Sequence, residues 1–333
     1  MGRMGDVRLD GVSVVLDGRP VVVDVDAEIA DGAFAAVVGP SGSGKSSLLR
    51  VIAGLTPSSA GAVILGGRDV TGTEPRERDI GMVFQTPAML PRRNVRRNVS
   101  FPLELRREAA ESIRQRVDAE SRAMQIEHLL LRNPETLSRG ELQLVQIART
   151  MVRAPGTLLL DEPFAPLDAH LRFTMRSEIG LLQRGYGLTT IMATNDPDDV
   201  AALASHVLVL SRTDPSDADS PFTVVQAGTP TEVARDPASL DVAGAVGSLW
   251  TLGATVRADG GGFWLDLQDA PGVRSRAWSP GLRRFEGAPV IVGFGVGDLV
   301  AHPNGEIAAV LDRRIPGAED PLLCRIGRTL VQA

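Results

Sequence analysis

The sequence is poor in three residue types, and each shortage is informative. Its one cysteine, Cys324, excludes an internal disulfide and is typical of a reducing compartment. Its one tyrosine is Tyr186. Its one lysine is Lys45, although lysine and arginine together number 35. Arginine therefore fills every other basic position, and the compact ammonium group is kept at a single place.

The chain also lacks any apolar run that approaches the roughly 18 residues of a membrane-spanning helix. Its start, Met-Gly-Arg-Met-Gly-Asp, is too polar for a secretory signal peptide. A formal net charge of −6 argues against nucleic acid as a partner. We therefore expect a soluble cytoplasmic protein that reaches a membrane only through a partner.

The single lysine lies in a glycine-rich segment that matches G-x-x-x-x-G-K-[ST] at every fixed position. Such glycines let backbone N–H groups face phosphates, and the ammonium reaches the β- and γ-phosphates as a point charge. The run 35–38 before the segment is typical of a buried strand, and 47–53 after it of a helix. The segment therefore predicts a nucleoside triphosphate site. Its expected binding residues are Gly39, Pro40, Ser41, Gly42, Ser43, Gly44, Lys45, Ser46 and Ser47.

Three further residues are candidates for the chemistry of that nucleotide. Asp161 and Glu162 follow the apolar run 157–160, so they are expected at the tip of a core strand. Asp161 is the candidate ligand of Mg²⁺, together with Ser46, and Glu162 is the candidate group that orients the attacking water. Gln85 ends another predicted strand and offers a side-chain carbonyl to the same ion.

The segment Leu137-Ser-Arg-Gly-Glu141 has two interpretations. Ser138 and Glu141 have the spacing of a capping box, which any helix can use. The free N–H groups and the serine hydroxyl of a helix N-terminus also suit a γ-phosphate. Both interpretations stay open from these residues alone.

Apolar strands that alternate with helical patterns predict an α/β fold. Helices are expected over 102–130 and 139–152, and buried strands over 157–160, 188–193 and 207–210. The apolar face of the first helix is expected to contain Ile113, Val117 and Met124.

The composition changes after about residue 237, where short strand patterns and glycine turns predict a small all-β domain. A hairpin is expected over 254–267, around the glycines 260–262. Further strands are expected over 290–293 and 307–311.

In their order, these motifs resemble those of ATP-binding-cassette (ABC) transporter ATPases. The loop Phe164–Asp168 and the strand tip Ala193–Asp196 complete that order. Within the superfamily, the chain is similar to the ATPase subunits of sugar-type importers. The segments that carry this closer likeness are 78–85, 98–103, 167–172 and 228–230.

The resemblance implies a P-loop NTPase domain over 1–236, with a helical subdomain over about 86–155, and an OB-like domain over 237–333. It implies ATP and Mg²⁺ as ligands, and a sugar or related polyol as the transported solute. The implied partners are transmembrane permease subunits, indirectly an extracytoplasmic solute-binding protein, and a second ATPase chain, identical or different. The implied location is peripheral, on the cytoplasmic face of the inner (plasma) membrane.

The resemblance also implies roles for residues outside the phosphate loop. Ser138 and Gly140 are expected to contact the ATP of a second copy, and Asp168 to lie at the same dimer interface. Val15 or Leu16 falls where the family has an aromatic residue against adenine. An aliphatic side chain there predicts weaker stacking.

Two departures from the family bear on catalysis. Asn195 stands where the family has a histidine that contacts the γ-phosphate; it can donate a hydrogen bond, but it is shorter and has no switchable charge. His206 lies too far along the chain to replace it. In the signature segment Arg139 replaces a glycine and Glu141 a glutamine. We expect Arg139 to offset the negative charge that Glu141 brings near phosphates.

Two functions remain open for such a chain. In the first, two copies enclose two ATP molecules, Glu162 and Asn195 support hydrolysis, and closure drives a permease. In the second, the chain is a regulatory half that mainly holds ATP beside another ATPase, which Asn195 favours. A DNA-repair ATPase is excluded because too few residues separate Lys45 from Ser138 for a long coiled coil. A GTPase is excluded because Asn195–Asp198 lacks the lysine of the guanine-binding motif.

Overall fold

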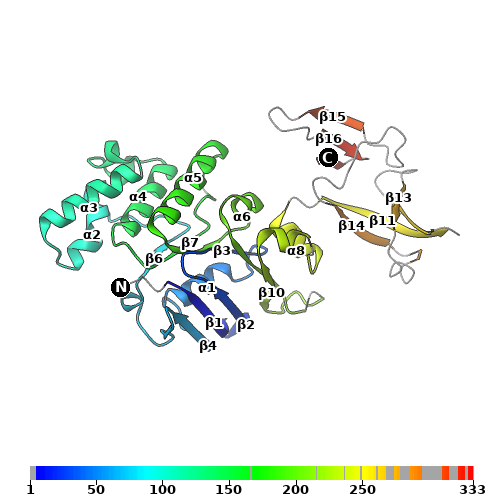
Figure 1. Cartoon of the computed structure of the whole chain (residues 1–333), viewed down its shortest axis with the longest axis horizontal. Coiled ribbons are helices and arrows are strands. Elements are labelled where there is room, and N and C mark those ends of the chain that lie inside the picture. The colour runs from blue at the N-terminus through cyan, green and yellow to red at the C-terminus, as the bar shows by residue number, and fades with distance from the viewer. Residues whose placement is uncertain are drawn as a thin grey trace. The chain divides into compact units, whose positions relative to one another are not determined.

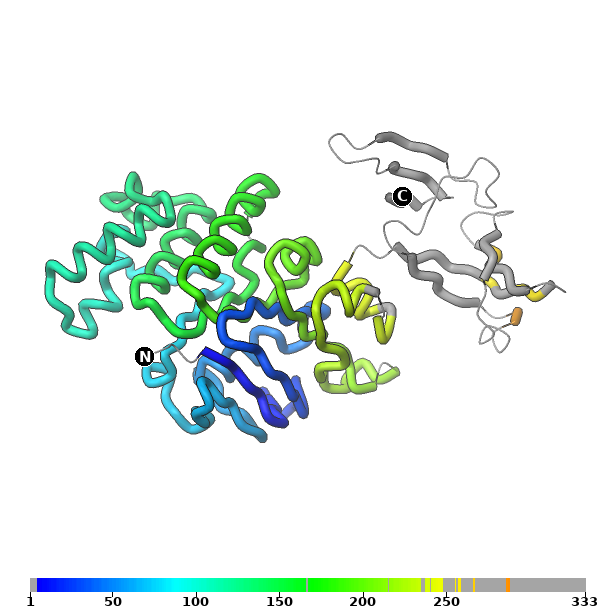
Figure 2. The backbone as a smooth tube through the Cα atoms, viewed as in Figure 1, coloured from blue at the N-terminus to red at the C-terminus, as the bar shows by residue number. Residues whose placement is uncertain are grey.

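The computed structural model divides into two compact units, Met1–Val246 and Gly247–Ala333 (Figure 1). The structure describes residues 5–165, 167–214, 216–235, 237–247, 250–259, 262–267, 274–277, 286–287, 289–294, 310–314, 322–326 and 329–332. Figure 2 draws in colour those of them whose side chains are also described.

A ten-stranded mixed sheet organises the first unit, in the order β5-β4-β1-β2-β10-β9-β3-β8-β7-β6. The neighbours β9, β3, β8, β7 and β6 run parallel, whereas β1, β2, β4 and β5 pair antiparallel. The strands are β1 (Val7–Leu16), β2 (Arg19–Ile29), β3 (Phe34–Val38), β4 (Ala60–Leu65), β5 (Arg68–Asp69), β6 (Ile80–Val83), β7 (Thr157–Asp161), β8 (Thr189–Ala193), β9 (His206–Arg212) and β10 (Phe222–Gly228).

Burial along the strands explains why the two halves differ in sequence. Every residue of β3, β7 and β8 is buried, because helices cover both faces of a parallel sheet, and these strands read as unbroken apolar runs. In β1 buried and exposed residues alternate over the first half of the strand, as expected where one face of an antiparallel sheet meets solvent. The three strands predicted at 157–160, 188–193 and 207–210 are confirmed as β7, β8 and β9.

Helices cover both faces of the parallel half, and α2, α3 and α4 gather at one end of the unit (Figure 1). One core cluster joins α2–α5 to Leu158 and Leu160 of β7, and another joins α1 to Leu159 on the opposite face. The helices are α1 (Lys45–Ile52), α2 (Val95–Leu105), α3 (Ala110–Ala123), α4 (Arg139–Met151), α5 (Ala169–Tyr186), α6 (Pro197–Leu203), α7 (Pro230–Arg235) and α8 (Leu240–Val246), with short 3₁₀ turns at Pro75–Glu77, Glu127–Leu129 and Pro134–Thr136.

The prediction of one helix over 102–130 is wrong, because α2 ends at Leu105 and α3 begins at Ala110. Between them Arg107 adopts a left-handed conformation with φ 55°. The turn lets both helices bury one face in the same cluster, which one straight helix would not allow. The predicted apolar face is confirmed, since Val117 and Met124 are buried there and Ile113 packs against them.

The described residues of the second unit form two antiparallel sheets, β13-β12-β11-β14 and β15-β16-β17. The predicted hairpin is present, with Ala254 opposite Leu267, although its turn residues 260–261 lie outside the described residues. The strand predicted at 307–311 is described only from Val310 onward. The strands are β11 (Trp250–Asp259), β12 (Gly262–Leu267), β13 (Arg274–Ala277), β14 (Pro289–Phe294), β15 (Val310–Arg314), β16 (Leu322–Ile326) and β17 (Thr329–Gln332).

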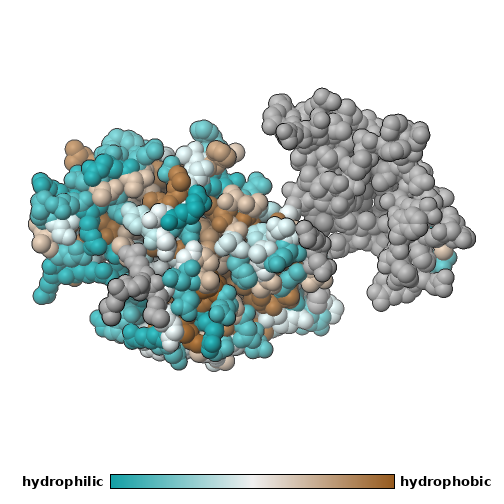
Figure 3. Space-filling model, in the orientation of Figure 1, coloured by the Kyte–Doolittle hydropathy of each residue, from teal (hydrophilic) through white to brown (hydrophobic). Residues whose placement is uncertain are grey.

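The described helices contain no segment long and apolar enough to cross a membrane. On the face shown in Figure 3, hydrophilic residues dominate the surface over α2 and α3.

Candidate active site

The phosphate loop, residues 39–46, leaves the sheet between two parallel strands. β3 pairs with β8 on one side and β9 on the other, so the loop emerges at the carboxyl edge of the sheet. Open α/β sheets bind ligands at this edge. Gly44 is the N-cap of α1 at φ 86°, and a Cβ there would lie 2.3 Å from a methyl group of Val22. Only glycine fits this position, because both the conformation and the space exclude a side chain.

The loop presents unsatisfied donors at the start of α1. Gly44 gives no side-chain cap, so the first N–H groups of the helix are free to bind an anion. The hydroxyl of Ser43 is buried without a hydrogen-bond partner. Pro40, Ser41 and Gly42 are exposed on the outer side of the loop, Gly39 is buried, and Ser47 is half-buried on α1. These features fit a phosphate cradle.

Lys45 folds back over this loop. Its Nζ donates to the carbonyl oxygens of Gly39, at 2.8 Å, and Pro40, at 3.0 Å. The side chain is only 4% exposed. Burial lowers the pKa of Lys45, while the nearby carboxylates of Glu162 and Asp161 act in the opposite direction. A guanidinium group is larger and planar, so this enclosed place explains why the chain uses lysine here.

The tips of β6 and β7 bring three candidate catalytic-site residues to the loop. Asp161 is buried at the end of β7, and its Oδ1 accepts a hydrogen bond from Ser46 Oγ at 2.6 Å. Glu162 follows with φ 43°, and its N–H donates to Ala193 of β8. Gln85 Nε2 donates to Glu162 Oε2 at 2.9 Å. Four residues predicted from separate motifs therefore lie next to one another.

The same residues fit a magnesium ion. Ser46 and Asp161 place a hydroxyl and a carboxylate oxygen within hydrogen-bond distance of each other, and Gln85 adds an amide beside them. Mg²⁺ prefers such hard oxygen ligands, and is usually held by one or two carboxylates together with substrate phosphates and water. Among the described residues, His, Cys, Asp and Glu form no cluster of three that could hold a metal ion alone. The donor set fits an ion that binds together with the nucleotide.

The signature segment forms the start of α4 and has a complete capping box. Ser138 is the N-cap; its Oγ accepts from the Glu141 N–H at 3.2 Å, and the Glu141 carboxylate accepts from the Ser138 N–H at 2.7 Å. Gly140 is buried against α5, where a Cβ would lie 2.1 Å from Leu171. The contacts of Ser138 and Gly140 therefore lie within α4 and on α5, rather than at the phosphate loop of the same chain.

The charge of Glu141 is balanced by a residue other than the predicted Arg139. Arg132 donates to Glu141 Oε1 at 3.0 Å, whereas Arg139 is exposed. The pKa of Glu141 is lowered, chiefly by the backbone hydrogen bond from Ser138 and also by Arg132. Arg139 instead lines an open hollow beside the Gln85 loop. The other residues that line it are Gln85, Thr86, Pro87, Leu142 and Ala165.

Comparison with known proteins shows which family the chain belongs to. The model of the ABC transporter family matches residues 22–165. The chain is 41% identical over 265 residues to the sn-glycerol-3-phosphate import ATP-binding protein UgpC of Yersinia pseudotuberculosis, covering 79% of this chain and 72% of the relative. This chain belongs to the ABC transporter ATP-binding proteins.

Other relatives extend the comparison. A protein of the same description from Burkholderia lata is 39% identical over 295 residues, covering 84% of this chain and 79% of the relative. The solved structure of CbiO1 from Clostridium perfringens, described as part of the ABC transporter complex cbiONQ, matches with a TM-score of 0.61 at 28% identity. That match covers 69% of this chain and 90% of CbiO1. The chain is therefore an ABC-type ATPase that binds ATP, with the P-loop fold expected from its sequence.

Asn195, the third candidate catalytic residue of the ABC ATPase, lies at the same edge of the sheet. Asn195 is exposed two residues after Ala193, the β8 residue opposite Asp161. His206 lies at the start of β9, beside Ala35, and so at the opposite end of the parallel strands from the phosphate loop. The structure therefore agrees that His206 cannot take the place of Asn195.

Two predicted contacts of the ABC ATPase lie on other elements. Val15 is 41% exposed on β1. This strand pairs with β2, and Val22 of β2 lies next to Gly44 of the phosphate loop. Asp168 is the N-cap of α5 and accepts from the Leu171 N–H at 2.9 Å. Their proposed contacts with nucleotide stay predictions.

The sequence reasoning missed a set of ion pairs behind the Asn195 tip. Arg172 and Arg176 of α5 bind Asp196, and Arg176 also binds Asp199 of α6. The signal available was the i, i+4 spacing of the two arginines, opposite a run of aspartates. That spacing alone does not say which carboxylates the arginines meet.

Proposed function

We propose that residues 1–236, with a helical subdomain over about 86–155, hydrolyse ATP to drive an importer of a sugar or related polyol. The observation that carries this proposal is the continuous set of contacts at the loop edge. Ser46 binds Asp161, and Gln85 binds Glu162, the next residue along the chain. A nucleotide held by the phosphate loop would therefore have its γ-phosphate beside a carboxylate suited to orient water.

Each residue of the site has a proposed role in this reaction. The Lys45 ammonium contacts the β- and γ-phosphates, and the N–H groups at the start of α1 hold the phosphate oxygens. Glu162 accepts a hydrogen bond from the attacking water and orients it, with Gln85 beside it. The Asn195 amide donates to an oxygen of the γ-phosphate, where negative charge develops.

Mg²⁺ would be held by Ser46 and Asp161, with Gln85 beside them, and would neutralise charge on the phosphate oxygens. The hydrogen bond between Ser46 and Asp161 supports this assignment, because it holds both oxygen ligands on the same side of the loop.

The start of α4 is proposed to act on a second copy of the domain. Ser138 is exposed at a helix N-terminus whose N–H groups suit a γ-phosphate, and its contacts lie away from its own phosphate loop. Two copies would thus enclose two ATP molecules, with Asp168 at the interface between them. Closure would drive permease subunits, which would place the chain at the cytoplasmic face of the membrane and bring it indirectly to a solute-binding protein.

The proposed class of transported solute rests on the descriptions of the related proteins. Several are described as sn-glycerol-3-phosphate import ATP-binding proteins, and glycerol phosphate is a phosphorylated polyol. A phosphorylated polyol or a sugar is therefore the class to test first.

Asn195 favours a second candidate, in which the chain is the ATP-holding half of a pair with another ATPase. A shorter amide at this place holds the transferred phosphate less well than an imidazole. Against this candidate, Glu162 is present and lies at hydrogen-bond distance from Gln85.

The test is Glu162→Gln in the purified full-length chain, which keeps the shape of the side chain but removes its basicity. We expect phosphate release to stop and an ATP-dependent dimer to accumulate, measured by light scattering after size-exclusion chromatography. The matched control is Glu127→Gln, because Glu127 is exposed on a 3₁₀ turn away from the loop. Phosphate release at the parent rate by Glu162→Gln would refute the proposed role of Glu162, whereas absence of phosphate release from the parent chain itself would favour the second candidate.

A further inference from the structure

Two arginines of α5 hold the segment that carries Asn195. Arg172 and Arg176 are one helical turn apart and face the same side of the helix. Asp196 Oδ2 accepts from Arg172 Nη1 at 2.5 Å and from Arg176 Nη2 at 3.0 Å. Asp196 is also the N-cap of α6, because its Oδ1 accepts from the Asp198 N–H. The residue that follows Asn195 is therefore fixed from two sides.

The residue before Asn195 is held by the same network. Thr194 is 2% exposed, and its Oγ1 donates to Asp199 Oδ2 at 2.6 Å. Asp199 is 3% exposed, and its other oxygen accepts from Arg176 Nε at 2.5 Å. The Asp196 N–H closes the ring by donating to Thr194 Oγ1 at 3.1 Å. Asn195 thus lies between two residues whose positions both depend on Arg176.

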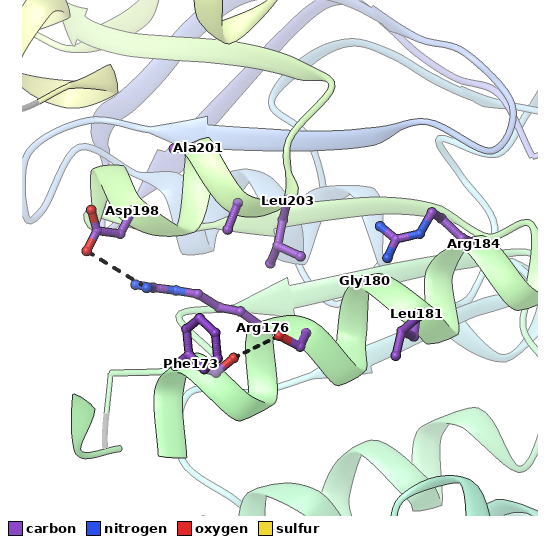
Figure 4. A pocket seen from close by; sticks show the side chains of 10 residues that line it. Phe173, Arg176, Gly180, Leu181, Arg184, Asp198, Ala201 and Leu203 are labelled. Carbon is purple, nitrogen blue, oxygen red and sulfur yellow. Dashed lines mark hydrogen bonds and ion pairs between the residues drawn. The ribbon is translucent and has the colours of Figure 1, made fainter. Parts of the chain in front are cut away.

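Figure 4 shows how Arg176 reaches this position from α5. Its side chain lies along a groove between α5 and α6, with Phe173 beside it and its guanidinium directed toward Asp198. The Asp198 contact is long, at 3.8 Å, and Asp198 is 78% exposed, so solvent screens it. Arg176 itself is 13% exposed, and its pairs with Asp196 and Asp199 are shielded. The shielded pairs with Asp196 and Asp199 are therefore the ones that fix the geometry of this segment.

The network also reaches the loop before α5. Arg172 Nη2 donates to the Leu167 carbonyl at 3.4 Å, and Asp168 caps the first turn of the same helix. The segment proposed to face a second copy is therefore connected to the Asn195 tip through one helix.

We propose that Arg176 is a positioning residue, which directs the Asn195 amide toward the γ-phosphate by holding Thr194 and Asp196. The inference rests on the proposed role of Asn195. A fold-stabilising role alone does not require this arrangement. A buried ion pair is weak evidence for stability, because removing its charges from water offsets much of their attraction, and its best-attested use is to fix one geometry. Burial raises the pKa of Asp199, which agrees with a carboxylate that needs its arginine partner.

The test combines Arg176→Gln with Asn195→Ala in the purified full-length chain. For each single variant and the double variant we would measure kcat and KM for ATP hydrolysis, the Kd of ATP, and the Tm. We expect Arg176→Gln to lower kcat about tenfold, with little change in the Kd of ATP. In the Asn195→Ala background the same substitution should leave kcat unchanged, because the amide that it displaces is already absent.

Two controls separate positioning from general damage. Arg184→Gln changes another arginine of α5 that lines the same groove, but it is exposed and lies about two helical turns beyond Arg176, so kcat should stay at the parent value. Arg172→Gln removes one of the two bonds to Asp196 and should give a smaller loss that also disappears with Asn195→Ala. If Arg176→Gln does not fold, Arg172→Gln still provides the comparison.

Equal losses of kcat in the two backgrounds would overturn the inference, since the effect of Arg176 would then not pass through Asn195. Parent-level kcat in Asn195→Ala alone is a different result. It would refute the proposed role of Asn195, and the inference with it, while hydrolysis dependent on Glu162 would stand.

Discussion

The hydroxyl of Ser46 donates to the carboxylate of Asp161 at 2.6 Å, across 115 residues of chain. Ser46 belongs to the loop after β3, and Asp161 ends β7, two strands away in the sheet. Parallel strands end at the same edge, so side chains that follow them meet even when the sequence separates them widely. This contact is what turns two separate motifs into one site.

Lys45→Ala should weaken ATP binding and stop turnover. The ammonium is 4% exposed and donates to the Gly39 carbonyl, so alanine removes a positive charge that is enclosed by the loop. We expect kcat/KM to fall by at least about 10²-fold, the usual effect of losing one preorganised contact to the transition state. Lys45→Arg should fail as well, because the enclosed space does not accept a planar guanidinium.

Nucleotide titration and phosphate release measure both effects. Arg50→Ala is the matched control, since Arg50 is exposed at the other end of the same helix. Turnover by Lys45→Ala at the parent rate would contradict the assignment of the phosphate loop.

Arg78→Lys should destabilise the fold, because Arg78 caps the carboxyl end of the helix that follows the phosphate loop. Its buried guanidinium donates to the carbonyl oxygens of Val51, Ile52, Thr71 and Thr73 at 2.8–3.1 Å. A lysine keeps the charge but concentrates its donors on one atom, so it cannot reach all four. We expect a loss of about 3 kcal/mol in the free energy of unfolding, measured by urea denaturation.

Arg76→Lys is the control for this loss. Its ion pair with Glu74 is exposed, at 77% and 65%, and such pairs contribute little. If the two variants unfold at the same urea concentration, the four hydrogen bonds of Arg78 make no net contribution.

Local patterns predicted the parts of the site that depend on neighbouring residues. The phosphate loop, the carboxylates after β7 and the capping box at Ser138 each occupy a few consecutive positions, and the structure has all of them where the sequence placed them. Parallel strands with apolar residues throughout were recognisable for the same reason. Each feature is a property of one short segment.

Features that depend on distant partners were not predictable. Arg132, and not the adjacent Arg139, balances Glu141, because the turn before α4 folds back on the helix. The break between α2 and α3 has no glycine or proline at its centre, only Arg107 with a positive φ, and it exists because both helices pack into one core. The antiparallel pairing of β1 with β2 and β4 also depends on partners that no single short segment reveals.

Glu120→Gln should change how stability depends on pH. Glu120 is 7% exposed on α3; one carboxylate oxygen accepts from the Tyr186 hydroxyl at 2.9 Å, and the other is buried without a partner. Burial raises the pKa of Glu120, although the bond from Tyr186 and the charge of Arg116 lower it. The folded protein therefore binds this proton more tightly than the unfolded chain does.

A carboxyl with a raised pKa contributes stability that is fully present below its unfolded pKa and is lost as the pH rises through its folded pKa. Glutamine does not titrate and keeps an oxygen for the Tyr186 hydroxyl. As the pH rises above about 4, the ordinary pKa of a glutamate, the parent should therefore lose stability relative to Glu120→Gln. Asp199 also has a raised pKa, but it is common to both proteins, so the difference isolates Glu120.

Urea denaturation at several pH values measures this difference. Tyr186→Phe should instead lower the free energy of unfolding at pH 7, because it removes the hydrogen-bond donor from the buried Glu120 carboxylate. A constant difference between Glu120→Gln and the parent across the range would show that Glu120 is not perturbed in the folded state.

Asn195→His should raise the rate of ATP hydrolysis, because it restores a longer side chain that can donate to the γ-phosphate. The tip is exposed after β8, and its flanking residues Thr194 and Asp196 are held in place, so the larger ring meets no enclosing wall. Removing one preorganised contact to the transition state costs about 10²–10³ in rate, and restoring one should recover part of that range.

The comparison is the steady-state ATPase rate of the parent, Asn195→His and Asn195→Ala, each as the full chain. We expect the parent rate to lie well below that of the histidine variant and above that of the alanine variant. This order would mean that the Asn195 amide works as a weaker donor. Equal rates for parent and histidine variant would show that the departure from the family is neutral. Hydrolysis by the histidine variant alone, with the parent as inactive as the alanine variant, would favour the second candidate function. In that case the chain holds ATP beside a partner ATPase, because Glu162 together with the shorter Asn195 amide does not complete the transition state.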